Sequence, residues 1–183
     1  MERTPMATLS TEPLTEDELI AQRKAWGGDR WDEVWDGVYF MSPLPNIEHQ
    51  IFVARLTSIF QAVVDAGNLG IVFAGVNVSD RADGWTHNYR CPDVAVVLPG
   101  CPAQNCDTHW YGGPDFVVEI VSPDDRSRKK FDFYAKVGVR EILLVDRAPW
   151  ALELYVLDDG EFRLAGQSTP DSSLQLQSTV LPL

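Results

Sequence analysis

The sequence predicts an α/β fold in which a mixed β-sheet is flanked by helices. Two observations carry this prediction. Segments with helical periodicity alternate along the chain with short runs rich in β-branched and aromatic residues, which is typical of α/β layering. Two of these runs, over residues 94–98 and 116–121, are almost continuously apolar, as buried strands are. Helices interleaved with such strands indicate a single layered core.

The N-terminal elements have local signals of their own. Thr15 and Glu18 have the spacing of a capping box, which predicts a short helix to about Ala25. Two β-rich runs, over residues 31–35 and 38–41, flank Asp36-Gly37, a pair typical of a tight hairpin turn. The sequence therefore begins with a short helix followed by a hairpin.

A long helix is expected over residues 47–65, ending at Gly67. Its predicted apolar face consists of Phe52, Leu56, Ile59 and Val63. A second helix is expected over residues 124–137, between Pro123 and Gly138. Strands are expected over residues 70–78, 94–98, 116–121, 141–145 and 152–157.

Length and composition bound the domain organisation. A chain of 183 residues is one ordinary domain, and its 45% hydrophobic and 23% charged residues are those of a soluble globular protein. We divide it into a leader with a short helix (1–29), a core domain (30–160) and a C-terminal tail packing on the core (161–183). Because no apolar stretch approaches membrane-spanning length and no signal peptide is recognisable, we expect a cytoplasmic protein with no membrane segment.

Charge limits the classes of partner. The formal net charge of −12 counts against a large basic surface for nucleic acid, so unaided affinity for DNA should be weak. The three cysteines are odd in number and are expected to be reduced. A zinc site is one interpretation of Cys101, Cys106 and His109, with Cys91 as a fourth ligand. The spacing of these residues matches no standard zinc knuckle.

Two carboxylates occupy unusual places. Glu119 interrupts the apolar run over residues 116–121, where an ionised carboxylate costs free energy unless it is neutralised. Asp93 directly precedes the apolar run over residues 94–98. The pair indicates convergence on a shared positive charge, and a hard divalent cation is the natural candidate. The alternatives are an exposed Asp93 at a strand entrance, and a buried ion pair of Glu119 with Lys130.

Lys130 and His49 are the other candidate site residues. On a helical wheel Lys130 shares a face with Tyr134 and Val137, from which it could reach the end of a neighbouring strand. The alternative is that its stem packs while its ammonium group extends to water. His49 and Glu48 open the long helix, where a histidine serves either a site or a helix cap, and Glu48 is the weaker candidate.

Several motifs give the chain a resemblance to the Uma2 family, within the PD-(D/E)XK nuclease superfamily. Those in the core are Pro92-Asp93-Val94, Val118-Glu119-Ile120-Val121-Ser122-Pro123, Lys130-x-x-x-Tyr134, Gly138-Val139 and Val145-Asp146. Upstream, Glu33-Val34-x-Asp36-Gly37 and a helix-opening His49 match as well, so the resemblance covers roughly residues 30–157. It implies a restriction-endonuclease-like core, a mixed sheet flanked by helices with carboxylates that hold magnesium.

The resemblance also implies a site and a reaction. Asp93, Glu119 and the main-chain carbonyl of Ile120 would bind Mg²⁺, or Mn²⁺ in its place, and the reaction would be hydrolysis of DNA phosphodiester bonds. The superfamily pattern places a lysine two positions after the glutamate, where this chain has Val121; the lysine of Uma2-like sequences matches Lys130 instead. Lys130 would orient the attacking water or stabilise developing charge, and His49 is counted among the catalytic candidates.

Other functions remain open from the sequence. The absent lysine at position 121 and the acidic composition favour a catalytically inactive binding or scaffold protein with a nuclease fold. A metal hydrolase of a small phosphorylated molecule would need no basic groove, and an accessory protein of a toxin system or mobile element is a further alternative. Six tryptophans leave aromatic surface to share, which favours a homodimer.

Overall fold

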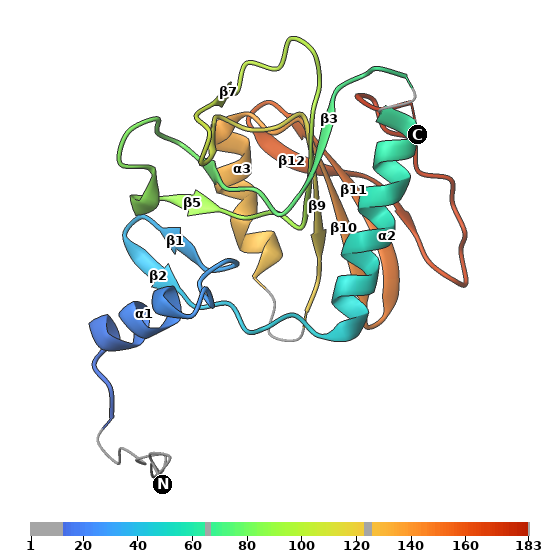
Figure 1. The fold of residues 1–183 in the computed structure, drawn as a ribbon. Coiled ribbons are helices and arrows are strands. Elements are labelled where there is room, and N and C mark those ends of the chain that lie inside the picture. The colour runs from blue at the N-terminus through green and yellow to red at the C-terminus, as the bar shows by residue number, and fades with distance from the viewer. Residues whose placement is uncertain (1–12, 65–66, 123–125, 183) are drawn as a thin grey trace, which may run out of the picture.

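The computed structural model describes residues 13–64, 67–122 and 126–182 (Figure 1). Within them the strands form two sheets, each of six strands. The central sheet has, in spatial order, β12 (Glu161–Ser168), β11 (Trp150–Asp158), β10 (Glu141–Arg147), β9 (Phe116–Ile120), β6 (Val94–Val97) and β3 (Ile71–Ala74). Strands β9 and β10 are parallel and the other neighbours are antiparallel. The sheet is therefore mixed, as the sequence predicts.

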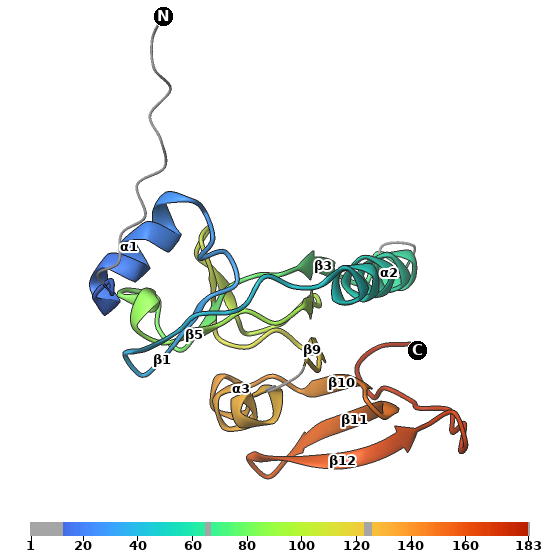
Figure 2. The same ribbon diagram turned by 90° about the horizontal axis from the view of Figure 1, so that it is seen from below.

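The second sheet is made of shorter strands. In order they are β2 (Val38–Phe40), β1 (Glu33–Trp35), β5 (Tyr89–Arg90), β4 (Val78–Ser79), β8 (Trp110–Tyr111) and β7 (Gln104–Asn105). Its strands β1 and β5 lie on the same side of the central sheet as α3 (Phe131–Val137), while α2 (Ile47–Val64) lies on the other side (Figure 2). Two short 3₁₀ helices, over Trp85–His87 and Ser127–Lys130, and the N-terminal helix α1 (Glu16–Ala25) complete the described elements.

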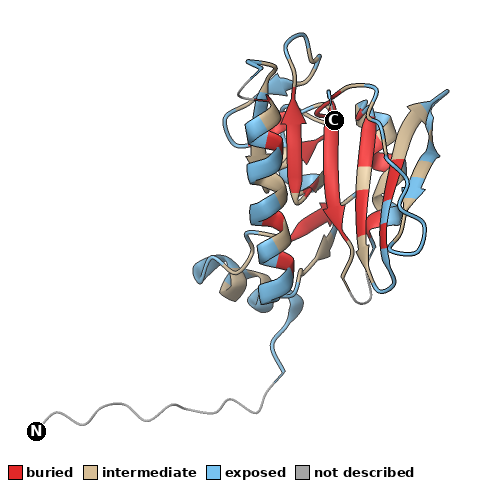
Figure 3. Cartoon of the chain, turned by 90° about the vertical axis from the view of Figure 1, so that its right-hand side faces the viewer, coloured by how far each residue is buried: buried red, intermediate tan, exposed pale blue. Residues whose placement is uncertain are grey.

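Alternation along β9 divides the core into two layers. Phe116, Val118 and Ile120 pack with α2, whereas Val117 packs with α3 on the opposite face. Because successive side chains of a strand point to opposite faces, Glu119 belongs to the α3 face. Figure 3 shows the buried central strands beside the more exposed α2. The sequence thus directs one carboxylate into an otherwise apolar strand.

Most predicted elements are confirmed. Helix α1 begins with the predicted capping box, in which Thr15 and Glu18 bond each other's backbone N–H groups. The hairpin turns at Asp36 and Gly37, with φ values of 48° and 86°, as a tight turn with both central residues left-handed requires. Within the described residues, no helix is both long and apolar enough to span a membrane.

Three expectations need correction. The single strand predicted over residues 70–78 is broken at Gly75, whose φ of +66° and contact with the Trp31 ring leave no room for a side chain. The predicted face of α2 is wrong in part, because Ile59 is 55% exposed. The residues of α2 that are buried are His49, Val53, Phe60 and Val64. Apolar residues surround much of this helix, so periodicity alone did not identify the buried face.

The third correction concerns the second predicted helix. Residues 123–125 lie outside the described part of the chain, and the helix that follows begins as a 3₁₀ turn at Ser127 and becomes α-helical at Phe131. Near the C-terminus, β12 occupies a segment for which no element was predicted. Its residues are mostly exposed at the sheet edge, where backbone pairing with β11 suffices and no apolar pattern is needed.

Candidate functional site

Strand register brings Asp93 and Glu119 together. Val94 pairs with Val118 in the antiparallel ladder of β6 and β9, so Asp93 lies one residue before the paired segment, opposite Glu119. Residues opposite each other on such strands have Cβ atoms about 5 Å apart and point to the same face. Asp93 Oδ2 accepts a hydrogen bond of 2.7 Å from the backbone N–H of Ile120. The convergence predicted from the two apolar strands is therefore supported by the geometry.

Lys130 reaches this pair from the 3₁₀ turn that precedes α3. Its ammonium nitrogen lies 3.0 Å from Glu119 Oε1 and 2.9 Å from Oε2. Only 12% of the Lys130 side chain is exposed, and it also forms an ion pair of 2.9 Å with Glu33 Oε1. The geometric prediction that this lysine approaches Glu119 is confirmed, and the alternative of an ammonium group extended into solvent is wrong. Its catalytic role stays a prediction.

Two residues join the site that the sequence placed in family motifs without assigning them a role in it. Glu33, in β1, accepts hydrogen bonds from the backbone N–H of Cys91 at 2.9 Å and from Trp35 Nε1 at 2.7 Å. Tyr134, one helical turn after Lys130, donates its hydroxyl to Glu119 Oε1 at 2.5 Å. The shared wheel face of Lys130 and Tyr134 was the signal for the tyrosine, whereas nothing in a short hairpin strand distinguishes Glu33 from a structural carboxylate.

His49 approaches the site from α2, on the other face of the sheet. Its Nε2 lies 3.3 Å from Asp93 Oδ1, and its side chain is 11% exposed. The backbone N–H of His49 is capped by Asn46 Oδ1 at 2.8 Å. His49 Nδ1 is buried and has no hydrogen-bond partner in the described part of the chain. His49 therefore lies both at the capped start of α2 and beside Asp93. Glu48 instead forms an ion pair with Arg147.

The charges of the site are unbalanced. Glu33, Asp93 and Glu119 face a single lysine. Burial, reinforced by the charges of Asp93 and Glu33 and opposed by Lys130, raises the pKa of Glu119 to about 8. Burial alone would lower the pKa of Lys130, but the two glutamates outweigh it and the net direction is upward. An added cation would relieve this excess of negative charge.

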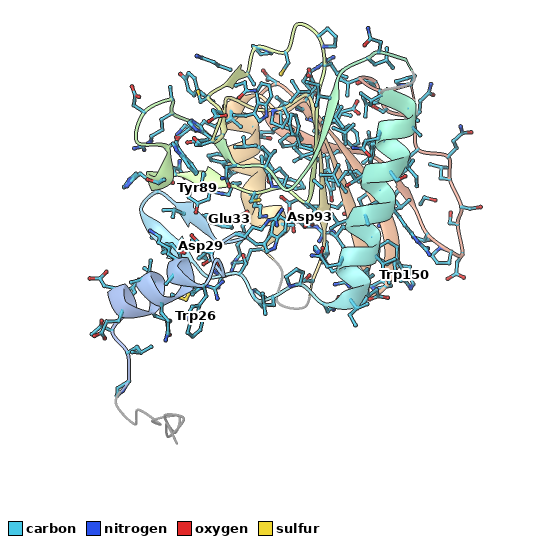
Figure 4. The ribbon with its side chains drawn as sticks, viewed as in Figure 1. Trp26, Asp29, Glu33, Tyr89, Asp93 and Trp150 are labelled. Atoms are coloured by element: carbon cyan, nitrogen blue, oxygen red, sulfur yellow. The ribbon has the colours of Figure 1, made fainter. Side chains whose placement is uncertain are left out.

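The site opens into a cavity of about 770 Å³. The carboxylates and Lys130 line one part of it, and residues of the hairpin, the following loop and the start of α2 line the rest. Figure 4 shows Glu33 at the hairpin and Asp93 nearer to α2, and both line the cavity. A ligand entering the cavity would therefore meet all three carboxylates and the lysine.

The donor set fits a hard cation rather than zinc. No cluster of three or more histidine, cysteine, aspartate or glutamate side chains arranged to hold a metal is found among the described residues. Asp93 and Glu119 are oxygen donors, and Mg²⁺ is commonly held by one or two carboxylates with water completing the shell. The structure does not gather the cysteines into a site, since Cys91 lines the cavity and Cys101 bonds the Gly113 carbonyl.

Comparison with known proteins agrees with the fold. The sequence matches the model of the Uma2 family, described as "Putative restriction endonuclease", over residues 26–182. A crystal structure from Anabaena variabilis, described as "a putative nuclease belonging to DUF820", has a TM-score of 0.67 and 19% sequence identity, with 92% of each chain covered. At this identity the similarity shows the fold alone. No curated protein matches the chain.

Because the family match spans most of the sequence, this chain belongs to the Uma2 family. The predicted α/β core, with mixed sheets flanked by helices, is confirmed by the fold and by its likeness to the Anabaena structure. Membership supports a nuclease-like function.

Proposed function

We propose that this member of the Uma2 family is a metal-dependent endonuclease that hydrolyses phosphodiester bonds in DNA. One observation carries the proposal: Lys130, displaced by eleven positions from Glu119, returns to that carboxylate within 3.0 Å. The chain therefore places two carboxylates and a lysine in one cavity although Val121 stands where the superfamily pattern has lysine.

Asp93, Glu119 and the carbonyl of Ile120 would hold Mg²⁺, with Mn²⁺ as a substitute. When bound, the cation would supply Lewis acidity toward a phosphodiester oxygen. The protein's own contribution is positioning. The Ile120 N–H fixes one Asp93 oxygen, His49 approaches the other, and Tyr134 with Lys130 holds the Glu119 carboxylate in one orientation.

Lys130 would also act on the transition state. Its charge lies in an enclosed part of the cavity, where it would stabilise the additional negative charge on a phosphate under attack and help to orient the attacking water. Tyr134 keeps its proton, because burial and the Glu119 charge raise the pKa of its hydroxyl. It is therefore a hydrogen-bond donor rather than a base.

Plasmid cleavage tests this proposal. Purified protein is incubated with supercoiled, linear and single-stranded DNA in Mg²⁺, in Mn²⁺ and in EDTA. The proposal expects nicked or linear product only in the presence of a cation. A preparation that binds the cation and cleaves none of the three DNA forms would contradict it. Cleavage of bis-(4-nitrophenyl) phosphate without cleavage of DNA would identify the hydrolase of small phosphorylated molecules instead.

A second candidate is a nuclease-fold binding protein without turnover. It is favoured by the fact that Lys130 already contacts three carboxylate oxygens, which match its three N–H donors. In that case the ion-pair cluster would serve stability alone. The homodimer also stays a prediction, and sedimentation that finds only monomer at micromolar concentration would contradict it.

A further inference from the structure

The cavity has a second wall that the proposed chemistry does not use. It is aromatic, and its residues are Trp31, Trp35, Tyr39 and Phe40, all half-buried and all from the hairpin or its entrance. The Trp35 and Phe40 rings pack with centroids 4.5 Å apart. Trp35 Nε1 donates to Glu33, which is itself paired with Lys130. The aromatic wall is thus connected by two contacts to the candidate catalytic lysine.

The guanidinium group of Arg126 packs over the ring of Phe40. The guanidinium carbon of Arg126 lies 4.8 Å from the centre of the Phe40 ring, and both residues line the cavity. A guanidinium group is planar and stacks on aromatic rings much as a nucleobase does. Arg126 is exposed, so it can turn away toward a backbone phosphate while a base takes its place.

The charge of the cavity argues against a double helix as its occupant. Of the described residues that line it, Arg126 and Lys130 are the lysines and arginines, against the carboxylates of Glu33, Asp93 and Glu119. Duplex binding draws its affinity chiefly from many basic contacts with phosphates, and the chain has a net charge of −12. Single-strand binding can instead draw on the stacking of bases on aromatic rings.

We propose that the aromatic wall around Phe40 binds an unstacked nucleobase, so that the preferred substrate is single-stranded or locally unpaired DNA. This inference rests on the proposed nuclease function, and it names the form of DNA that the same site takes. A cavity of about 770 Å³ has room for a single nucleotide. Phe40 pairs opposite Glu33 in the hairpin, and Glu33 pairs with Lys130, so the phosphate next to a base on Phe40 would lie toward Lys130 and the carboxylates.

The test compares binding with cleavage. Fluorescence anisotropy follows a fluorescein-labelled single-stranded oligonucleotide and its duplex, each in Mg²⁺ and in Ca²⁺, and a gel of the same samples reports cleavage. We expect the single strand to bind more tightly than the duplex. Phe40→Leu should weaken single-strand binding by about tenfold, and Phe40→Trp should retain it. Phe162→Leu, the same change at a half-buried ring on β12 outside the cavity, should have no effect.

Each outcome separates the two proposals. Equal use of duplex and single strand, with Phe40→Leu cleaving as well as the unaltered protein, overturns the inference and leaves the nuclease function standing. Phe40-dependent binding of the single strand without cleavage in Mg²⁺ supports the base-binding wall and overturns the nuclease function. Loss of single-strand binding in Phe40→Trp as well as in Phe40→Leu, with both variants folded, also overturns the inference, because a larger ring should preserve stacking.

Discussion

Two buried glutamates lie at opposite ends of the same pair of parallel strands. Glu119 in β9 is opposite Leu144, and Glu141 in β10 is opposite Phe116. Their exposures are 3% and 0%, so burial does not distinguish them. What differs is the surroundings of each carboxylate, and that difference separates a structural role from a site.

Glu141 is enclosed by neutral donors from the C-terminal segment. Ser178 Oγ donates to one oxygen at 2.5 Å, and the backbone N–H of Thr179 donates to the other at 2.7 Å. The Thr179 hydroxyl donates to that second oxygen as well. Hydrogen bonds of this kind satisfy a buried carboxylate without a cation, and they attach the C-terminal segment to the sheet.

Glu119 has charged neighbours and an opening to a cavity. Lys130 neutralises part of its charge, while Asp93 and Glu33 oppose its ionisation. A buried carboxylate on an apolar strand is therefore weak evidence of function by itself. The stronger evidence is an unbalanced cluster of charges beside a space that a ligand can enter.

The largest expected effect distinguishes Lys130 from Lys136, at the other end of α3. Lys130→Met should lower cleavage by a factor of about 10² or more, because it removes charge stabilisation from the transition state. It should also destabilise the fold, because Glu33 and Glu119 lose a buried partner. Lys136→Met, at an exposed ion pair with Asp80, is the matched control and should cleave normally.

Initial rates of plasmid cleavage, with thermal melting of both variants, check this prediction. If Lys130→Met cleaves as fast as Lys136→Met, the lysine is only a structural partner. Lys130→Arg should restore little activity, since a planar guanidinium cannot replace a compact ammonium group in an enclosed site.

The next effect separates stability from activity. Glu141→Gln should lower the free energy of unfolding by about 1–3 kcal/mol, because three donors lose a charged acceptor, while cleavage is retained. Glu119→Gln should abolish cleavage with a smaller loss of stability, since an amide is less costly to bury. Urea titrations paired with cleavage rates measure both. The same pattern of losses in the two variants would remove the distinction between the glutamates.

The sequence predicted Glu119 because the apolar run over residues 116–121 surrounds it on both sides. Glu141 begins its strand directly after Arg140, so it resembles an ordinary surface residue. Its burial depends on residues 178–179, nearly forty positions later, and no local pattern reports such a contact. For the same reason the sequence placed Glu33 in a family motif but left its role open, since its position beside Lys130 follows from how the hairpin packs.

More of the fold than of the site could be predicted from the sequence. Capping, turn and periodicity signals are local, so α1, the hairpin and the central strands could be predicted from neighbouring residues. The choice of buried face on α2 could not, because Ile59 and Phe60 are equally apolar and only packing exposes one and buries the other. Family motifs supplied Lys130, which no spacing rule places beside Glu119.

A further effect concerns pH in the absence of metal. The pKa of Glu119 is raised from 4.5 to about 8 in the folded protein, so the folded state binds the proton more tightly. This contribution to stability is complete below about pH 4.5 and is lost as the pH rises through about 8. The slope should be at most about 1.4 kcal/mol per pH unit. Urea titrations in EDTA between about pH 4.5 and 8 should show this slope in Glu141→Gln, which keeps Glu119. A slope that persists in Glu119→Gln would show that Glu119 is not its source.

We propose that Asp93 and Glu119 form a divalent cation site and that Glu141 does not contribute to one. Thermal melting over a range of Mg²⁺ or Mn²⁺ concentrations tests it most directly, because a ligand of the folded state stabilises in proportion to RT ln(1 + [L]/Kd). The unaltered protein and Glu141→Gln should both gain stability as the cation increases, and Asp93→Asn should gain far less. The absence of a cation-dependent shift in the unaltered protein, or an undiminished shift in Asp93→Asn, would contradict a cation site at these two carboxylates.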